Sequence, residues 1–263
     1  MIKKGVTSGA KGIVEYVTSK EYSKSKYPDI TNIVLGSICW NLVEKAETIR
    51  FLAENERSES LGILTRSFLE LFVQYKFILK RETDKRAESY YYAYKVSSAE
   101  KIKAMLDYDQ SHHKLTENEL KRLQNEVPGA KGYNDYLSHY KSLSDQLYDN
   151  PKQHSQKWYN LHGETRKFKQ LMKEVGFRET DYQFFYGLGS LDIHGSAAAV
   201  NFKIEKGIDS SIPLFVIYEA IPRWLNTAVT ELARYYGVLK KSKVERYLLQ
   251  IGTSHNGDYL QNT

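Results

Sequence analysis

The amino-acid sequence predicts an all-α protein, folded as a single irregular antiparallel helical bundle with a polar, loop-containing middle segment. Three observations support this fold class. Apolar residues recur three and four positions apart over most of the chain, which is the spacing of one helix face. Capping residues, prolines and glycines stand where these patterns begin and end. The first three long patterns are joined by short connections, as in antiparallel bundles.

The first three predicted helices occupy residues 29–55, 58–81 and 84–109. Asp29 follows a proline and is the expected N-cap of the first helix. The second carries a broad apolar face, and the third is rich in tyrosine. We therefore expect these helices to form the first part of the bundle.

The middle of the chain is more polar. We expect a loop at 108–116, helices at 117–126 and 134–147, and a second loop at 148–158.

The helical pattern then returns. The sequence predicts a short helix over 163–176 that ends at Gly176, and a longer helix over 181–198 with Thr180 as its cap.

The last predicted helix begins at Ser211, and Pro222 should kink or divide it. Residues 252–263 look like a disordered tail. The pattern has no clear domain boundary, so residues 1–251 are expected to form one helical domain.

Composition limits the function classes. The 263 residues are 41% hydrophobic, enough for one sizeable core or two intimately packed subdomains. No apolar run reaches the roughly 18–20 residues that cross a bilayer, and the start has no signal-peptide pattern, so we expect no membrane contact. The single Cys39 cannot form an internal disulfide, which favours the cytoplasm.

Charge and tyrosine content leave nucleic-acid binding open. The net charge of +6 permits contact with RNA, but basic and acidic residues are interleaved, as on solvated helix faces. The chain has 21 tyrosines against 10 phenylalanines. Tyrosines beside lysines can stack on bases or fill the seams between helices.

Two constellations carry possible chemistry. The first is Arg66 and Glu70, one helical turn apart on the 58–81 helix. The pair is either an ordinary intrahelical ion pair or, at the edge of the core, an arginine oriented by a carboxylate to bind an anion.

The second constellation is a polar stripe of Tyr186, Ser190 and His194 at i, i+4 and i+8. Gly187 and Gly189 beside it bare the backbone, so either another helix or a ligand approaches closely. Ser190 and His194 can form a nucleophile–base pair, or the hydroxyl can fix the imidazole tautomer. The histidine can equally be a satisfied core residue.

The sequence predicts neither a cofactor nor a metal. It has no phosphate-binding glycine loop and no nucleophile elbow, and no carboxylate–histidine spacing completes a metal site.

The order of these motifs resembles a family of uncharacterised bacterial all-helical proteins of unknown function. The resemblance covers about residues 35–200. It consists of an R-S-x-L-E helix, a tryptophan followed by a short basic helix, and a Y-x3-S-x3-H-G-S pattern. The matching positions are Arg66, Ser67, Leu69, Glu70, Trp158, Arg166, Tyr186, Ser190, His194 and Gly195.

The chain is more loosely similar to the HEPN superfamily of helical bundles, which includes RNases of toxin and phage-defence systems. Their hallmark is an arginine four to six residues before a histidine on one helix. This sequence lacks that arginine ahead of His194, so Arg66 of another helix would have to replace it.

Together with these two resemblances, the features predict a bacterial defence- or toxin-type protein that acts on RNA or a nucleotide phosphate through a metal-independent Arg/His site. Arg66 holds the phosphate, Glu70 orients Arg66, and His194 acts as general acid or base beside Ser190 and Tyr186. The alternative is a non-catalytic binding or assembly module, with the same cluster as a buried structural network or a small-ligand sensor pocket. The sequence does not decide whether the protein is an enzyme.

The predicted partners follow from the same features. They are RNA or a nucleotide, a protein of a defence or toxin complex, and a second copy of the chain packed through the small residues Ala197–Ala199.

Overall fold

The computed structural model describes residues 2–24, 29–55, 61–112, 116, 118, 133–150, 157–165, 167–187 and 216–256. Throughout these residues the regular elements are helices, so the predicted all-α class is confirmed. The chain divides into two compact units, one formed by 1–81 with 169–263 and the other by 82–168. That residues 1–251 behave as one domain stays a prediction.

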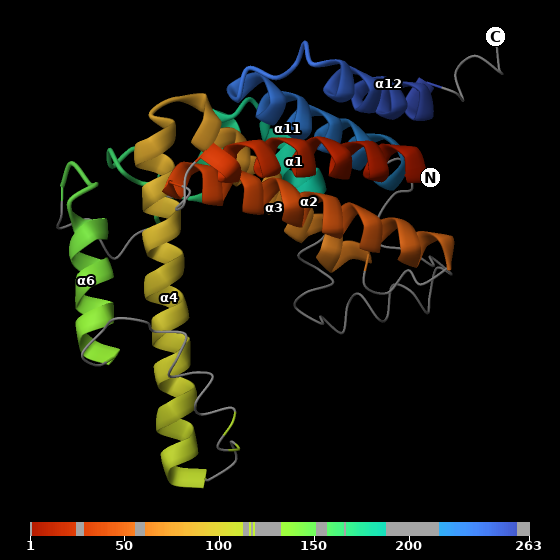
Figure 1. The fold of residues 1–263 in the computed structure, drawn as a ribbon. Helices are drawn as coiled ribbons and strands as arrows, with labels where there is room; N and C mark the ends of the chain where they lie inside the picture. Colours follow the sequence, from red (N-terminus) through yellow and green to blue (C-terminus); the bar gives the residue numbers. More distant parts are fainter. Residues whose placement is uncertain are drawn as a thin grey trace, which may run out of the picture. The chain divides into compact units, whose positions relative to one another are not determined.

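The first unit begins with α1 (Lys4–Lys24), α2 (Ile30–Glu54) and α3 (Leu61–Lys80). The predicted cap of α2 is confirmed, because the Asp29 carboxylate accepts a hydrogen bond from the backbone N–H of Asn32 at 2.7 Å. The predicted serine-led start of α3 lies outside the described residues. Figure 1 shows α1, α2 and α3 running side by side, as expected for a bundle.

Helices α11 (Ile221–Tyr235) and α12 (Ser242–Asn256) complete the helical bundle of the first unit. Helix α11 contacts α1, α2 and α3, and α12 packs on α1. The core between them is aliphatic and aromatic. Its fully buried side chains include Leu35, Ile38, Leu42, Phe68, Leu69, Tyr75, Leu225, Val229 and Leu232.

Two glycines of α1 allow α12 to approach closely. A Cβ atom on Gly9 would lie 2.8 Å from Ile251 Cγ1 and 2.9 Å from the backbone oxygen of Tyr247. A Cβ atom on Gly12 would lie 2.5 Å from the Tyr247 ring. Helix α1 was not predicted, since the predicted helices begin at residue 29, and a close approach was expected only at the glycines after Tyr186.

The predicted final helix is two helices. A turn after Tyr235 contains Gly237, whose φ of 64° is in the left-handed region that favours glycine. The final helix was predicted to be kinked or divided at Pro222 only, and a second break was not predicted. Gly237 makes this break, because its left-handed backbone ends α11. Pro222 lies in the first turn of α11, directly after the π-helix η4 (Val216–Ala220), so the predicted division at this proline is confirmed. Helix α12 continues through Asn256, beyond the boundary predicted at residue 251.

The helix predicted over 163–176 is shorter in the structure. Helix α7 spans Phe168–Glu174, because residues 157–165 form turns that bury Leu161 and Asn160. Gly176 ends α7 as predicted: its φ is 97°, and the N–H groups of Gly176 and Phe177 bond back to the carbonyls of Lys173 and Met172.

The next helix begins earlier than Thr180. Helix α8 (Glu179–Asp181) has Arg178 as its N-cap, because the Asp181 carboxylate accepts the Arg178 backbone N–H at 2.8 Å. It continues directly into the π-helix η3 (Tyr182–Gly187). The remainder of the predicted 181–198 helix lies outside the described residues.

The second unit contains α4 (Thr83–His112) and α6 (Tyr133–Asp145), which pack side by side. Helix α4 runs through the start of the loop predicted at 108–116. That prediction was wrong for residues 108–112 because no proline or glycine interrupts α4 there. Tyrosines join the two helices: the Tyr140 ring lies 6.0 Å from Tyr92 and 6.4 Å from Tyr91. These tyrosines fill a helix seam.

Cys39 lies fully buried in α2, and burial raises the pKa of its thiol to about 12. Within the described ranges, no helix combines the length and the apolar character that crossing a bilayer demands. The cytoplasmic location stays a prediction.

Candidate functional site

The structure brings together three of the five predicted site residues. Arg66 and Glu70 lie on α3, and Tyr186 lies on η3. Ser190 and His194 lie outside the described residues, so the predicted meeting of Arg66 with His194 stays a prediction.

Arg66 bonds to both neighbours. Its Nε donates to Glu70 Oε1 at 2.9 Å, and its Nη2 donates to the Tyr186 hydroxyl oxygen at 2.6 Å. The guanidinium carbon also lies 4.0 Å from the centre of the Tyr186 ring. The Arg66 guanidinium thus joins the first predicted constellation to Tyr186, the one described member of the second, and it contacts two elements 120 residues apart in sequence.

The contact with Tyr186 is the stronger of the two restraints on Arg66. An exposed i,i+4 ion pair stabilises a helix by about 0.3–0.5 kcal/mol. A cation–π contact contributes about 0.5–2 kcal/mol, more when it is desolvated. Because the Arg66 side chain is only 14% exposed, Tyr186 is the main group that holds it against η3.

One edge of the guanidinium makes no hydrogen bond. The Nη1 atom of Arg66 is buried and has no hydrogen-bond partner within the described part of the chain. An unsatisfied buried donor costs about 1–3 kcal/mol, and more when the group is charged. A charged donor left unbonded in this way favours an anionic partner.

Tyr186 remains a neutral phenol. Burial raises its pKa above the ordinary value of 10.0, and the Glu70 carboxylate raises it further, while Arg66 opposes both effects. The guanidinium is thus balanced by one carboxylate, that of Glu70. Glu70 is 34% exposed, so solvent weakens its hold on Arg66.

An aromatic cluster fixes the position of η3. Trp224 of α11 contacts Phe72 of α3 at 5.9 Å, Phe177 at 6.0 Å and Phe185 of η3 at 5.0 Å between ring centres. This cluster joins α3, α11 and the segment around η3. Phe185 precedes Tyr186, so the packing of one ring places the next against Arg66.

Two further members of the site, Tyr182 and Lys169, were not predicted from the sequence. The Tyr182 ring stacks on Tyr186 at 5.0 Å with an interplanar angle of 16°. The ammonium of Lys169 lies 5.8 Å from the Tyr182 ring centre. Tyr182 precedes Tyr186 by one helical turn, which is the signal that could have identified it. Two stacked rings, Tyr186 and Tyr182, thus lie between two cations, Arg66 and Lys169, and this series is called here the Arg66–Lys169 stack.

A pocket of about 510 Å³ adjoins the outer end of this stack and is called the Tyr182 pocket. Tyr182 and Phe177 form part of its wall. Its charged side chains are Lys169, Lys173, Arg178 and Glu179. With three cations against one carboxylate, its field favours an anion.

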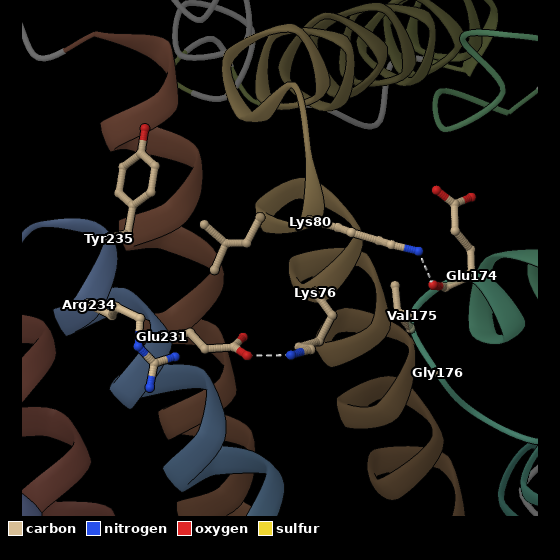
Figure 2. A pocket seen from close by; sticks show the side chains of 9 residues that line it. Lys76, Lys80, Glu174, Val175, Gly176, Glu231, Arg234 and Tyr235 are labelled. Atoms are coloured by element: carbon tan, nitrogen blue, oxygen red, sulfur yellow. Dashed lines mark hydrogen bonds and ion pairs between the residues drawn. The ribbon is translucent and has the colours of Figure 1, made fainter.

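A second pocket of about 510 Å³ lies between α3 and α11, bordered by the segment after α7 (Figure 2). Several of its charged groups already have partners. Lys76 pairs with Glu231, and Lys80 donates to the backbone carbonyl of Glu174. The second oxygen of Glu231 is buried without a hydrogen-bond partner in the described ranges, and its negative charge disfavours an anionic ligand here.

The donor groups of the site are those of an anion site. Among the residues that the structure describes, no three histidine, cysteine, aspartate or glutamate side chains are arranged to hold a metal ion. An arginine edge, lysines and phenol rings can bind phosphate and stack on planar groups.

No curated protein and no solved structure matches the chain. A model of a family of unknown function, DUF5677, matches residues 32–210. This range contains Arg66, Glu70, Tyr186, Ser190 and His194, and agrees with the resemblance expected over about residues 35–200. It excludes α1, α11 and α12. The match covers more than half of the sequence, and the chain therefore belongs to this family of unknown function, DUF5677.

Proposed function

We propose that the protein is a bacterial defence- or toxin-type protein that binds and cleaves RNA through a metal-independent Arg/His centre. The main support is the state of Arg66: its guanidinium is oriented by Glu70 and Tyr186, and its Nη1 makes no hydrogen bond with the described residues. An arginine fixed in this way can stabilise the charge of a phosphate in the transition state without moving.

The proposed reaction uses the 2′-hydroxyl of RNA. His194 takes the hydroxyl proton, the oxygen attacks the adjacent phosphorus, and a 2′,3′-cyclic phosphate forms as the bond to the 5′-oxygen breaks. The leaving oxygen takes a proton from water. Arg66 neutralises the phosphate charge, Ser190 positions His194, and Glu70 and Tyr186 position Arg66.

The test is RNA cleavage by the purified full chain in the presence of a metal chelator. A matched control exists in α2, where Arg50 and Glu54 form another i,i+4 pair with 2.6 Å between Arg50 Nη1 and Glu54 Oε2. The Arg50 side chain is 21% exposed, close to the 14% of Arg66. Circular dichroism verifies that each variant is folded.

We expect His194→Ala to lower the cleavage rate about 10²–10⁴-fold, as for loss of a general acid or base. Arg66→Ala should lower it about 10²–10³-fold, as for loss of a charge-stabilising donor. Arg50→Ala should leave it unchanged. Expression in bacteria should inhibit growth with the wild type and not with the first two variants. Intact RNA with folded wild type, or equal rates for Arg66→Ala and Arg50→Ala, contradicts the proposal.

The alternative is a structural network. It is favoured by the observation that Arg66 joins α3 to η3 through a partly buried hydrogen bond. In this case Arg66→Ala should lower the melting temperature more than Arg50→Ala, while RNA remains intact with the wild type and all three variants. The same experiment thus distinguishes a catalytic centre from a fixed helix register.

A further inference from the structure

The Tyr182 pocket has a cation whose charge is not already neutralised. Lys169 pairs with Glu179, and Arg178 pairs with Asp181 at 3.3 Å. Lys173 lines the same pocket, is exposed, and forms no ion pair with the described residues. An added anion can therefore contact Lys173 without first breaking an existing ion pair.

The Arg66–Lys169 stack connects this pocket to the Arg66 centre. Its three steps measure 4.0, 5.0 and 5.8 Å, so the Lys169 ammonium lies no more than about 15 Å from the Arg66 guanidinium. A nucleoside monophosphate has one phosphate, so it can occupy either the Tyr182 pocket or the Arg66 centre, but not both. A short single strand carries a phosphate on every nucleotide and can occupy both.

The chemistry of the pocket fits a nucleic-acid backbone. Single-stranded nucleic acid binds to grooves that combine cations along its phosphates with aromatic side chains. The Tyr182 pocket supplies both kinds of group, with Lys173 and Arg178 beside Tyr182 and Phe177. The pocket in Figure 2 instead presents two acidic side chains, Glu174 and Glu231, among its cations.

We propose that the Tyr182 pocket is a phosphate subsite that binds the RNA backbone a few nucleotides from the Arg66 centre. The ligand is accordingly a single-stranded oligonucleotide rather than a mononucleotide. This inference rests on the proposed function, because it takes Arg66 as the place where the reacting phosphate binds.

The experiment measures binding by fluorescence anisotropy over a series of salt concentrations. The probes are a labelled hexanucleotide RNA with 2′-O-methyl groups, which cannot be cleaved through its 2′-hydroxyls, and a labelled nucleoside monophosphate. The full chain is compared with Lys173→Ala, Arg66→Ala and the control Lys240→Ala. Lys240 is also exposed and lies in the turn between α11 and α12, away from the pocket lining.

Lys173→Ala should reduce the slope of log affinity against log salt for the hexanucleotide by about 0.7, the value for one phosphate contact to a single strand. It should leave binding of the monophosphate unchanged. Lys240→Ala should leave both unchanged, and Arg66→Ala should weaken both probes.

Equal slopes for Lys173→Ala and Lys240→Ala, with binding lost in folded Arg66→Ala, overturn the subsite and leave the proposed function intact. If folded Arg66→Ala binds both probes as tightly as the wild type does, the proposed function is overturned instead. Absence of binding of either probe to the wild type overturns both.

Discussion

His162 lies between two carboxylates in the second unit, and this arrangement makes stability depend on pH. Its Nδ1 is 2.6 Å from Asp149 Oδ2, and its Nε2 is 2.8 Å from Glu82 Oε2. The hydrogen bond to Asp149 is the main cause that raises the pKa of His162 above 6.5. The bonds to His162 lower the pKa of Asp149 below 3.8 and that of Glu82 below 4.5. Lys85, paired with Asp149, and Arg86, which also lowers the pKa of Glu82, are further charged neighbours.

We expect the stabilisation by His162 to be greatest between about pH 4.5 and 6.5. The imidazolium contribution is complete below 6.5 and is lost as the pH rises through the raised pKa. The carboxylate contributions are present above 4.5 and are lost as the pH falls through the lowered pKa values. The measurement is the melting temperature against pH for wild type and His162→Gln. His139→Gln is the control, because its ring contacts Tyr140. A wild-type advantage over His162→Gln that is the same at every pH contradicts this prediction.

Part of the candidate site could be predicted from the sequence, residue by residue. The Arg66–Glu70 pair follows from helix spacing alone, because both residues lie within one regular helix. Its contact with Tyr186 depends on packing across 120 residues, which no local pattern contains. Tyr182 could have been identified from its position four residues before Tyr186, whereas Lys169 could not, because its role comes from a contact with the Tyr182 ring between separate elements.

At the scale of elements, the packing of α1 on α12 predicts opposite changes in stability for two glycine variants. Gly9→Ala should lower the free energy of unfolding by about 1–3 kcal/mol, because the new Cβ would meet the backbone oxygen of Tyr247, which cannot rotate away. Gly252→Ala, on α12, meets nothing within 4 Å and should raise it by up to about 1 kcal/mol. Urea unfolding measures both. Equal stabilities for the two variants would show that α12 does not depend on the bare surface of α1.

Element boundaries were predictable where the signal is local. Asp29 and Gly176 act within one turn, and the structure confirms both. The turn at Gly237 was missed because the apolar pattern of α11 resumes in α12, so periodicity alone gave one helix. The π-helix η3 also escaped prediction, since its wider turn depends on how its aromatic residues pack.

At the scale of the whole molecule, we expect one cooperative unfolding transition despite the two compact units. The apolar side chains buried in the second unit are few within the described ranges, too few for an independent core. They are Ala87, Ala99, Ile102, Tyr148, Tyr159 and Leu161.

The three tryptophans allow this to be measured. Trp158 belongs to the second unit, whereas Trp40 and Trp224 belong to the first. Urea unfolding followed by fluorescence should give the same midpoint for a Trp158→Phe variant and for a variant with Trp40→Phe and Trp224→Phe. Circular dichroism of the wild type should coincide with both. Two separate midpoints would mean that the units unfold as independent domains.

The pairing of α1 with α12 also has a consequence for protein synthesis. Gln250 donates a hydrogen bond to Ser8 across 242 residues of sequence, so α1 leaves the ribosome long before its partner exists. At about 5–20 residues per second, this delay is on the order of tens of seconds. During that time the glycine-lined face of α1 lacks α12. Residues 32–210, which match the family, are translated before α12. The nascent chain thus completes the packing of α1 only after α12 has been translated.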